Sequence, residues 1–226
     1  MSAYQLHLYE DRIEAGAEPI YLPRAPRAIY VVDGDATLEF ERGAQHQPGG
    51  TGWVGDGQLA ILAGADGARL WRWELQAAAR PAEAGLLGSA PRAHSVSKLS
   101  AEITLDPGFD WLMRCDRVDF PPGGIAHTHV HQGPGIRCTL HGEIAIEIDG
   151  ARHTHGAGQA WLELGRDPVL APTTPDAETA FIRCFLLPQA CRGRSSIRYV
   201  KIEDARRPKD QRYHVFAERL LTLAGA

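Results

Sequence analysis

The sequence predicts an all-β protein made of two similar lobes. Most apolar stretches are short, alternate with polar residues and are rich in β-branched side chains. Glycine, proline and aspartate interrupt these stretches at intervals of about ten residues. A strand-and-turn pattern in the first half of the chain also recurs in the second half. Together these observations favour an antiparallel sandwich or barrel over alternating strands and helices.

Nine segments have the length and composition of strands, and turn-forming residues bound them. In chain order they are residues 28–32, 36–41, 58–62, 69–75, 111–120, 135–140, 144–148, 160–164 and 180–187. Helical signals are confined to residues 75–84 and residues 213–223. We therefore expect very little helix.

The recurring pattern is an apolar strand, a glycine turn and a second strand. It spans residues 28–36, with Gly34 in the turn, and residues 136–144, with Gly142 in the turn. A repeat at a spacing of about a hundred residues indicates two similar lobes rather than a solenoid.

The stretch between the two halves, residues 77–97, is rich in alanine, glycine, proline and serine, which is typical of a connector. We accordingly expect a first β lobe in residues 1–93, a second lobe in residues 94–190 and a C-terminal tail in residues 191–226. The tail mixes basic and acidic residues, and we interpret it as a solvated face or a segment that packs on a neighbouring subunit.

The composition is that of an ordinary soluble globular protein. The net charge is −4 and no basic block is present, so nothing indicates a nucleic acid or membrane partner. Residues 1–10 lack the basic stretch and apolar run of a signal peptide. The four cysteines show no CxxC spacing, which favours free thiols in a reducing compartment. We expect a cytoplasmic protein whose partner is a small-molecule ligand or substrate.

The three histidines His127, His129 and His131 alternate along one predicted strand, directly after a Pro-Pro-Gly-Gly turn. Side chains at i, i+2 and i+4 of a strand share one face, so we expect the three imidazoles to point the same way. Each ring needs partners for two nitrogens, which makes histidine a costly core residue. Neutral imidazole is a common ligand of zinc, iron, copper and nickel. The pattern therefore favours a divalent metal site over its alternative, a solvated edge strand.

These residues resemble the first motif of the cupin family, which runs Gly, five residues, His-x-His, three or four residues, Glu, six residues and Gly. Gly123, His129, His131 and Gly142 fit this motif without a gap, but Gly135 stands where the family has its glutamate ligand. The resemblance implies a double-stranded β-helix, or jelly-roll, cupin barrel. It further implies a bicupin-like chain with a metal motif only in its second half, and pairing of two chains into a homodimer.

The family's second motif is matched less closely. Gly165 stands at its glycine, Glu163 replaces its proline, and Pro168 replaces its histidine ligand. Glu163 lies in an otherwise apolar run, and a buried carboxylate needs a partner, so we predict it as the third metal ligand. The alternative is an outward-facing side chain. Two histidines and one carboxylate would match the arrangement of non-haem Fe(II) oxygenases.

Three more residues have predicted roles around the metal. His127 either supplies a third nitrogen or lies at the pocket rim as an acid or base, and we favour the rim. Arg137 has a forked guanidinium that suits a carboxylate, so it is either an anion clamp in the barrel or part of a rim ion pair. Trp161 either lines the pocket or packs in the core.

The first lobe is expected to hold no metal site. Aligning the two glycine turns puts Tyr21 and Pro23 where the second lobe has His129 and His131. One metal ion per chain is therefore expected.

We predict a metal-dependent enzyme that acts on a small organic acid or ring compound, with an Fe(II) dioxygenase favoured. One alternative is a non-oxidative lyase, isomerase or hydrolase that uses Zn, Mn or Ni. The other is a cupin that binds a small ligand and has no activity.

Overall fold

The computed structural model describes residues 2–78, 85, 87 and 90–223, and the chain divides into two compact units. The first is Met1–Gly108 with Arg219–Ala226, and the second is Phe109–Glu218. This boundary comes later than the one expected between residues 93 and 94, because strand β7 (Ala93–Leu105) pairs with β1 (Ser2–Ile13) and so belongs to the first unit.

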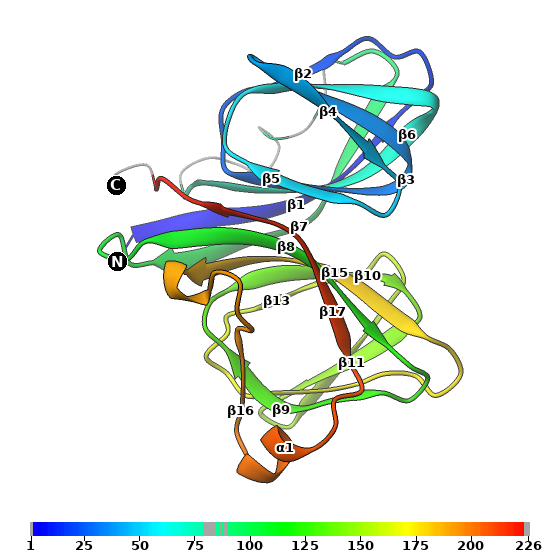
Figure 1. Ribbon diagram of the computed structural model, residues 1–226. Coiled ribbons are helices and arrows are strands. Elements are labelled where there is room, and N and C mark those ends of the chain that lie inside the picture. The colour runs from blue at the N-terminus through cyan, green and yellow to red at the C-terminus, as the bar shows by residue number, and fades with distance from the viewer. Residues whose placement is uncertain (1, 79–84, 86, 88–89, 224–226) are drawn as a thin grey trace. The chain divides into compact units, whose positions relative to one another are not determined.

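The first unit is a seven-stranded antiparallel sheet, as far as its described residues show (Figure 1). Its central path runs β4-β3-β6-β1-β7, while β2 pairs with β6 and β5 pairs with β3. The strands not yet given are β2 (Ile20–Leu22), β3 (Arg27–Phe40), β4 (Gly43–Pro48), β5 (Gly52–Gly55) and β6 (Leu59–Ala77). The expected helix over residues 75–84 is wrong at its start, because residues 75–77 continue β6. Residues 79–84 of that prediction lie outside the described residues.

The interior of the first unit contains a buried network of charged side chains. Arg72 donates from Nε to Asp11 at 2.6 Å, and its Nη1 lies 2.7 Å from Glu74 Oε1. Arg27 donates from Nε to the same glutamate oxygen at 3.0 Å. All four side chains are buried. Because solvent does not reach these groups, each charge is stabilised by the opposite charges beside it.

The Glu74 carboxylate should make the stability of this unit depend on pH. Burial alone would raise the pKa of Glu74, but Arg72 and Arg27 outweigh burial and leave it below the ordinary 4.5. A lowered folded-state pKa gives stability that is present above the unfolded-state pKa and lost as the pH falls through the folded one. Replacing Glu74 by glutamine should therefore destabilise the protein most at neutral pH. The gap in melting temperature between the wild type and Glu74→Gln is expected to narrow below about pH 4.5, as thermal melts from pH 7 to pH 3 would show. A gap that stays constant over this range would contradict the prediction.

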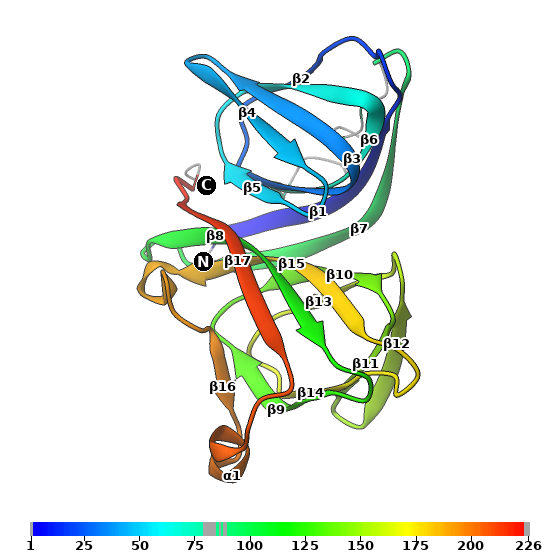
Figure 2. The same cartoon turned by 45° about the vertical axis from the view of Figure 1, so that its right-hand side comes forward.

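The second unit is a jelly roll in which two five-stranded antiparallel sheets face each other (Figure 2). The first sheet runs β13-β10-β15-β8-β17 and the second runs β12-β11-β14-β9-β16. The strands are β8 (Trp111–Phe120), β9 (Ile125–His131), β10 (Gly135–His141), β11 (Glu143–Ile148), β12 (Ala151–Gly156), β13 (Ala160–Glu163), β14 (Val169–Pro172), β15 (Thr179–Pro188), β16 (Ile197–Tyr199) and β17 (Arg212–Leu220). The all-β jelly-roll prediction is confirmed.

The C-terminal segment differs from the expected tail. Residues 213–223 were expected to be helical, but Arg212–Leu220 form β17, which pairs with β8. β16 likewise adds to β9. The helices described around them, η2 (Gln189–Cys191) and α1 (Ile202–Arg206), are short. None of the described helices is long and apolar enough to cross a membrane.

Candidate metal centre

A cavity of about 290 Å³ lies inside the second unit, between the inner faces of its two sheets. Its walls combine an apolar part, drawn from a core cluster, with a polar part. The polar residues contributed by the barrel strands β9, β10, β13 and β15 are His129, His131, Arg137, Glu163 and Arg183. The cavity is therefore the place where most of the predicted site residues meet.

Strand β9 presents His129 and His131 to the cavity, as predicted, but not His127. Ala126 pairs with Ala171 and His129 with Val169, so β9 advances by one residue more than β14 between these pairs. Such a bulge shifts the alternation of side chains, and Ala126 takes the inward place instead of His127. The expectation that three imidazoles share one face is thus wrong. His127 lies instead 4.0 Å from Asp204 and is not among the described residues that line the cavity.

Glu163 lies in register opposite Gly135, the position at which the family motif has its glutamate. A Cβ atom at residue 135 would lie 2.4 Å from the Cys184 carbonyl oxygen and 2.8 Å from the ring of Phe185, so no side chain fits there. The neighbouring strand thus supplies the carboxylate that β10 cannot carry. Glu163 is buried and points inward, which excludes the outward-facing alternative.

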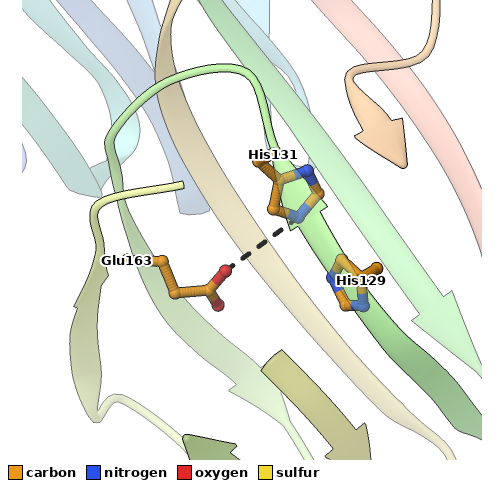
Figure 3. A group of neighbouring side chains, drawn as sticks. All are labelled: His129, His131 and Glu163. Carbon is orange, nitrogen blue, oxygen red and sulfur yellow. Dashed lines mark ion pairs between the residues drawn. The ribbon is translucent and has the colours of Figure 1, made fainter. Parts of the chain in front are cut away.

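His129, His131 and Glu163 come together as one buried group (Figure 3). One nitrogen or oxygen atom from each lies within 4.8 Å of the others. Glu163 Oε2 is buried and lies 2.8 Å from Arg137 Nη2, a contact that lacks the geometry of a hydrogen bond. It lies 3.9 Å from His131 Nε2. A buried carboxylate oxygen beside two imidazoles is a ligand set that suits a divalent cation, so these residues fit a metal ion.

Both imidazoles are uncharged at neutral pH, as a metal ligand has to be. Burial, reinforced by Arg183 and Arg137, holds the pKa of His131 well below the ordinary 6.5. Burial also lowers the pKa of His129, and the attraction of Glu163 offsets this only in part. The contact between His131 and Glu163 is therefore not an ion pair at neutral pH.

Hydrogen bonds also fix how the two rings are turned. His129 Nδ1 lies 2.7 Å from the carbonyl oxygen of His127, which can only accept, so this nitrogen carries the proton. The lone pair of His129 is then on Nε2. His131 Nδ1 lies 3.3 Å from the hydroxyl of Ser196, which leaves Nε2 of that ring toward Glu163. Such outer contacts orient metal-binding histidines in many proteins.

Arg137 and Trp161 both line the cavity and contact Glu163, and Trp161 also belongs to the core cluster. Trp161 donates from Nε1 to Glu163 Oε1 at 2.8 Å. Arg137 lies with Nη2 at 2.8 Å from Glu163 Oε2 and donates from Nη1 to the Gly135 carbonyl at 2.6 Å. Burial lowers the pKa of Arg137 to about 10, so it stays charged at neutral pH. Their contacts therefore hold the carboxylate, a role that the sequence did not indicate for either residue.

Sequence reasoning missed two parts of the cavity wall. Arg183 lines the cavity from β15, although the sequence showed only a central arginine in an apolar strand. The C-terminal segment supplies the other part, in residues Ser195, Ile197, Tyr199, Lys209, Gln211 and Tyr213. β16 pairs with β9 from Tyr199 opposite His129 to Ile197 opposite His131 (Figure 2). A short alternation of polar and apolar residues at 196–200 was the available signal, but it is too brief to be distinguished from a loop.

No protein-family model and no curated protein matches this sequence. Solved structures do resemble it. They include a cupin 2 conserved barrel domain protein from Leptotrichia buccalis, at a TM-score of 0.50 and 14% identity, covering 82% of this chain and 85% of that one. A variant of the Bacillus subtilis oxalate decarboxylase gives a TM-score of 0.61 at 14% identity, covering 86% and 71%. The fold is a cupin fold.

This cupin fold is shared with proteins of different kinds. Procruciferin, an 11S globulin from Brassica napus, matches at a TM-score of 0.57 and 8% identity, covering 80% of this chain and 75% of that one. A decarboxylase and a globulin thus share one architecture. What the present cupin fold does has to be inferred from its own site.

Proposed function

We propose that this protein is a metal-dependent enzyme acting on a small organic acid or ring compound, and that it is a non-haem Fe(II) dioxygenase. The observation that carries the proposal is the buried group of His129, His131 and Glu163, in which one nitrogen or oxygen atom of each residue lies within 4.8 Å of the others. Two imidazoles and one carboxylate are the ligand set of non-haem Fe(II) oxygenases.

The chain's own residues have distinct tasks in this proposal. His129 and His131 would hold the ion through neutral nitrogens, and Glu163 would contribute the negative charge. When bound, Fe(II) would supply the redox chemistry that lets O2 react with an organic molecule. Arg137 and Trp161 keep the carboxylate in place. His127 is given no part in the reaction, because its side chain lies away from the cavity.

The cavity walls limit the size of the substrate. The cavity volume of about 290 Å³ is at the small end for ligand pockets. In a dioxygenase both atoms of O2 enter the substrate, whose own bonds supply all the electrons that reduce O2. No further reductant is then consumed, so the cavity needs room only for O2 and one small molecule.

The first test is the metal content of the purified protein, measured by mass spectrometry for the wild type and for the double variant His129→Ala, His131→Ala. About one equivalent of iron per chain is expected in the wild type and none in the double variant. Incubation with small organic acids under ¹⁸O2 should then give products that contain both labelled atoms. Absence of bound metal in both proteins, even after reconstitution with Fe(II) under reducing conditions, would exclude the proposal.

A second candidate is a lyase or isomerase of the same cavity that does not use O2. It is favoured by the contact between Arg137 and Glu163 at 2.8 Å, which already offsets the charge of the carboxylate. Glu163 would then move a proton of the substrate, and Zn, Mn or Ni at the histidines would act as a Lewis acid. Turnover at an undiminished rate without O2 would support this candidate.

We also propose that the chain is a bicupin whose first unit has no metal site. Tyr21, which takes the place of His129 in the repeat, is 79% exposed and thus does not point into a core. In the interior of that unit, the places near Arg72 are taken by a network of paired charges and by an apolar core cluster, neither of which is a ligand set for a metal.

A further inference from the structure

Two arginines lie side by side in the cavity wall, but their side chains are buried to different degrees. Arg137 and Arg183 are cross-strand partners of β10 and β15, and both guanidinium groups stack on the ring of Phe185, at 4.6 and 4.5 Å. The Arg137 side chain is 1% exposed, whereas that of Arg183 is 11% exposed. Because Arg183 also lines the cavity, part of its guanidinium faces the space that a ligand would fill.

Asp116 holds Arg183 in one orientation. Arg183 donates from Nε to Asp116 Oδ1 at 2.5 Å and from Nη2 to Oδ2 at 3.2 Å. Its Nη1 donates no hydrogen bond to any described residue, and this atom is not fully buried. Nη1 is therefore an accessible donor on a fixed group. Such a donor suits a carboxylate, which accepts charge-assisted hydrogen bonds from guanidinium.

The part of the wall next to the two arginines, on the same sheet, suits a flat apolar group. Trp161 and Phe181 meet edge to face with ring centroids 5.4 Å apart, and Phe120 lies 6.2 Å from Phe181. Ile144 and Ile146 of the same core cluster face the cavity as well. Rings set at such angles pack well against another aromatic ring.

The charges inside the cavity also favour an anion. The side chains of Arg137 and Arg183 are offset by those of Glu163 and Asp116. Because these four charges cancel one another, they leave the positive charge of a bound divalent ion uncompensated. An uncompensated buried charge is costly, so an anionic ligand would be stabilised.

We propose that Arg183 binds the carboxylate of an aromatic monocarboxylic acid, whose ring packs against Phe120, Trp161 and Phe181. This inference rests on the proposed function in taking the cavity as the substrate site, and it names the substrate class. Asp116 is a positioning residue that fixes the guanidinium. Arg137 is excluded from this task because Glu163 and a backbone carbonyl already occupy it.

The test is direct binding of benzoate and of its neutral analogue benzamide, measured by calorimetry on the metal-free and on the zinc-loaded protein. Benzoate should bind at least about 10-fold more tightly than benzamide in one or both forms. Arg183→Lys should reduce benzoate affinity at least about 10-fold and leave benzamide affinity unchanged. The double variant Asp116→Asn, Arg183→Met removes both charges together, so it avoids a lone buried carboxylate and should show the same loss.

Arg117→Met is the matched control. Arg117 lies next to Asp116 on β8 and pairs with Asp119 outside the cavity, so its removal should leave benzoate affinity unchanged. Equal affinity for benzoate and benzamide, or benzoate binding that survives in both Arg183 variants, would overturn the inference. Benzoate binding without any metal uptake would overturn the proposed function and leave the inference standing. Metal uptake without benzoate binding in either form would do the reverse.

Discussion

Replacing Glu163 by glutamine is expected to weaken the binding of a divalent metal ion at least about 100-fold. Removing a residue that only hydrogen-bonds to a metal ligand already lowers metal affinity about 10- to 100-fold, and Glu163 is proposed to be a ligand itself. The substitution keeps the shape of the side chain and the acceptor for Trp161 Nε1, but it removes the negative charge that faces His129 and His131. Two neutral imidazoles alone bind such ions weakly. Titration of the metal-free protein with Zn²⁺ or Co²⁺, in competition with a chromophoric chelator, measures the change.

Glu147→Gln is the control for this prediction. Glu147 lies on β11 of the same unit and pairs with Arg152 at the surface, so the variant loses the same charge without altering the cavity. Its metal affinity should equal that of the wild type. If Glu163→Gln bound the metal as tightly as Glu147→Gln does, Glu163 would not be a ligand.

The variant Arg72→Met should lower the free energy of unfolding by about 3–5 kcal/mol, because it strands buried carboxylates. Arg72 donates two hydrogen bonds to Asp11 and one to the Gly85 carbonyl, and its guanidinium stacks on the ring of Tyr9 at 4.5 Å. Asp11 is fully buried and would lose the cation that offsets its charge. A loss of this size is a large part of the 5–15 kcal/mol typical of folded proteins. Urea unfolding followed by tryptophan fluorescence would measure it.

Arg12→Met provides the comparison. Arg12 is 66% exposed, and its buried partner Glu10 keeps its contacts with Trp71 and Lys98, so the variant should lose only about 0–1 kcal/mol. If the Arg72 and Arg12 variants lost equal stability, the buried network would have no special part in holding the first unit together. Arg72→Lys, which keeps a positive charge, should lie between the two.

Much of the second unit could be predicted from local pattern. Alternation and turn residues indicated its strands, and the spacing of His129 and His131 indicated that both side chains share one face. The inward direction of Glu163 could be predicted because a carboxylate in an apolar run needs a partner. These predictions of strand and side-chain direction agree with the structure because each depends on residues close together along the chain.

The failures depend on contacts that are distant in sequence. The bulge that turns His127 away is fixed by pairing with β14, and no residue near His127 signals it. The segments β16 and β17 are strands because they join β9 and β8, which lie far back in the chain. Tertiary pairing here overrides a local helical preference over residues 213–223. Arg183 could not be recognised as a cavity residue until Asp116 and Phe185 were placed around it.

Because the C-terminal segment forms one wall of the cavity, the order of synthesis bears on when a metal ion can enter. A ribosome releases the chain from its N-terminus, so β9, β10 and β13 emerge well before β16 and β17. His129, His131 and Glu163 can therefore assemble while the side of the barrel next to β9 still faces solvent. Loading an ion at that stage needs no opening of the finished cavity, and in the completed protein the same wall should slow the exchange of the ion with chelators.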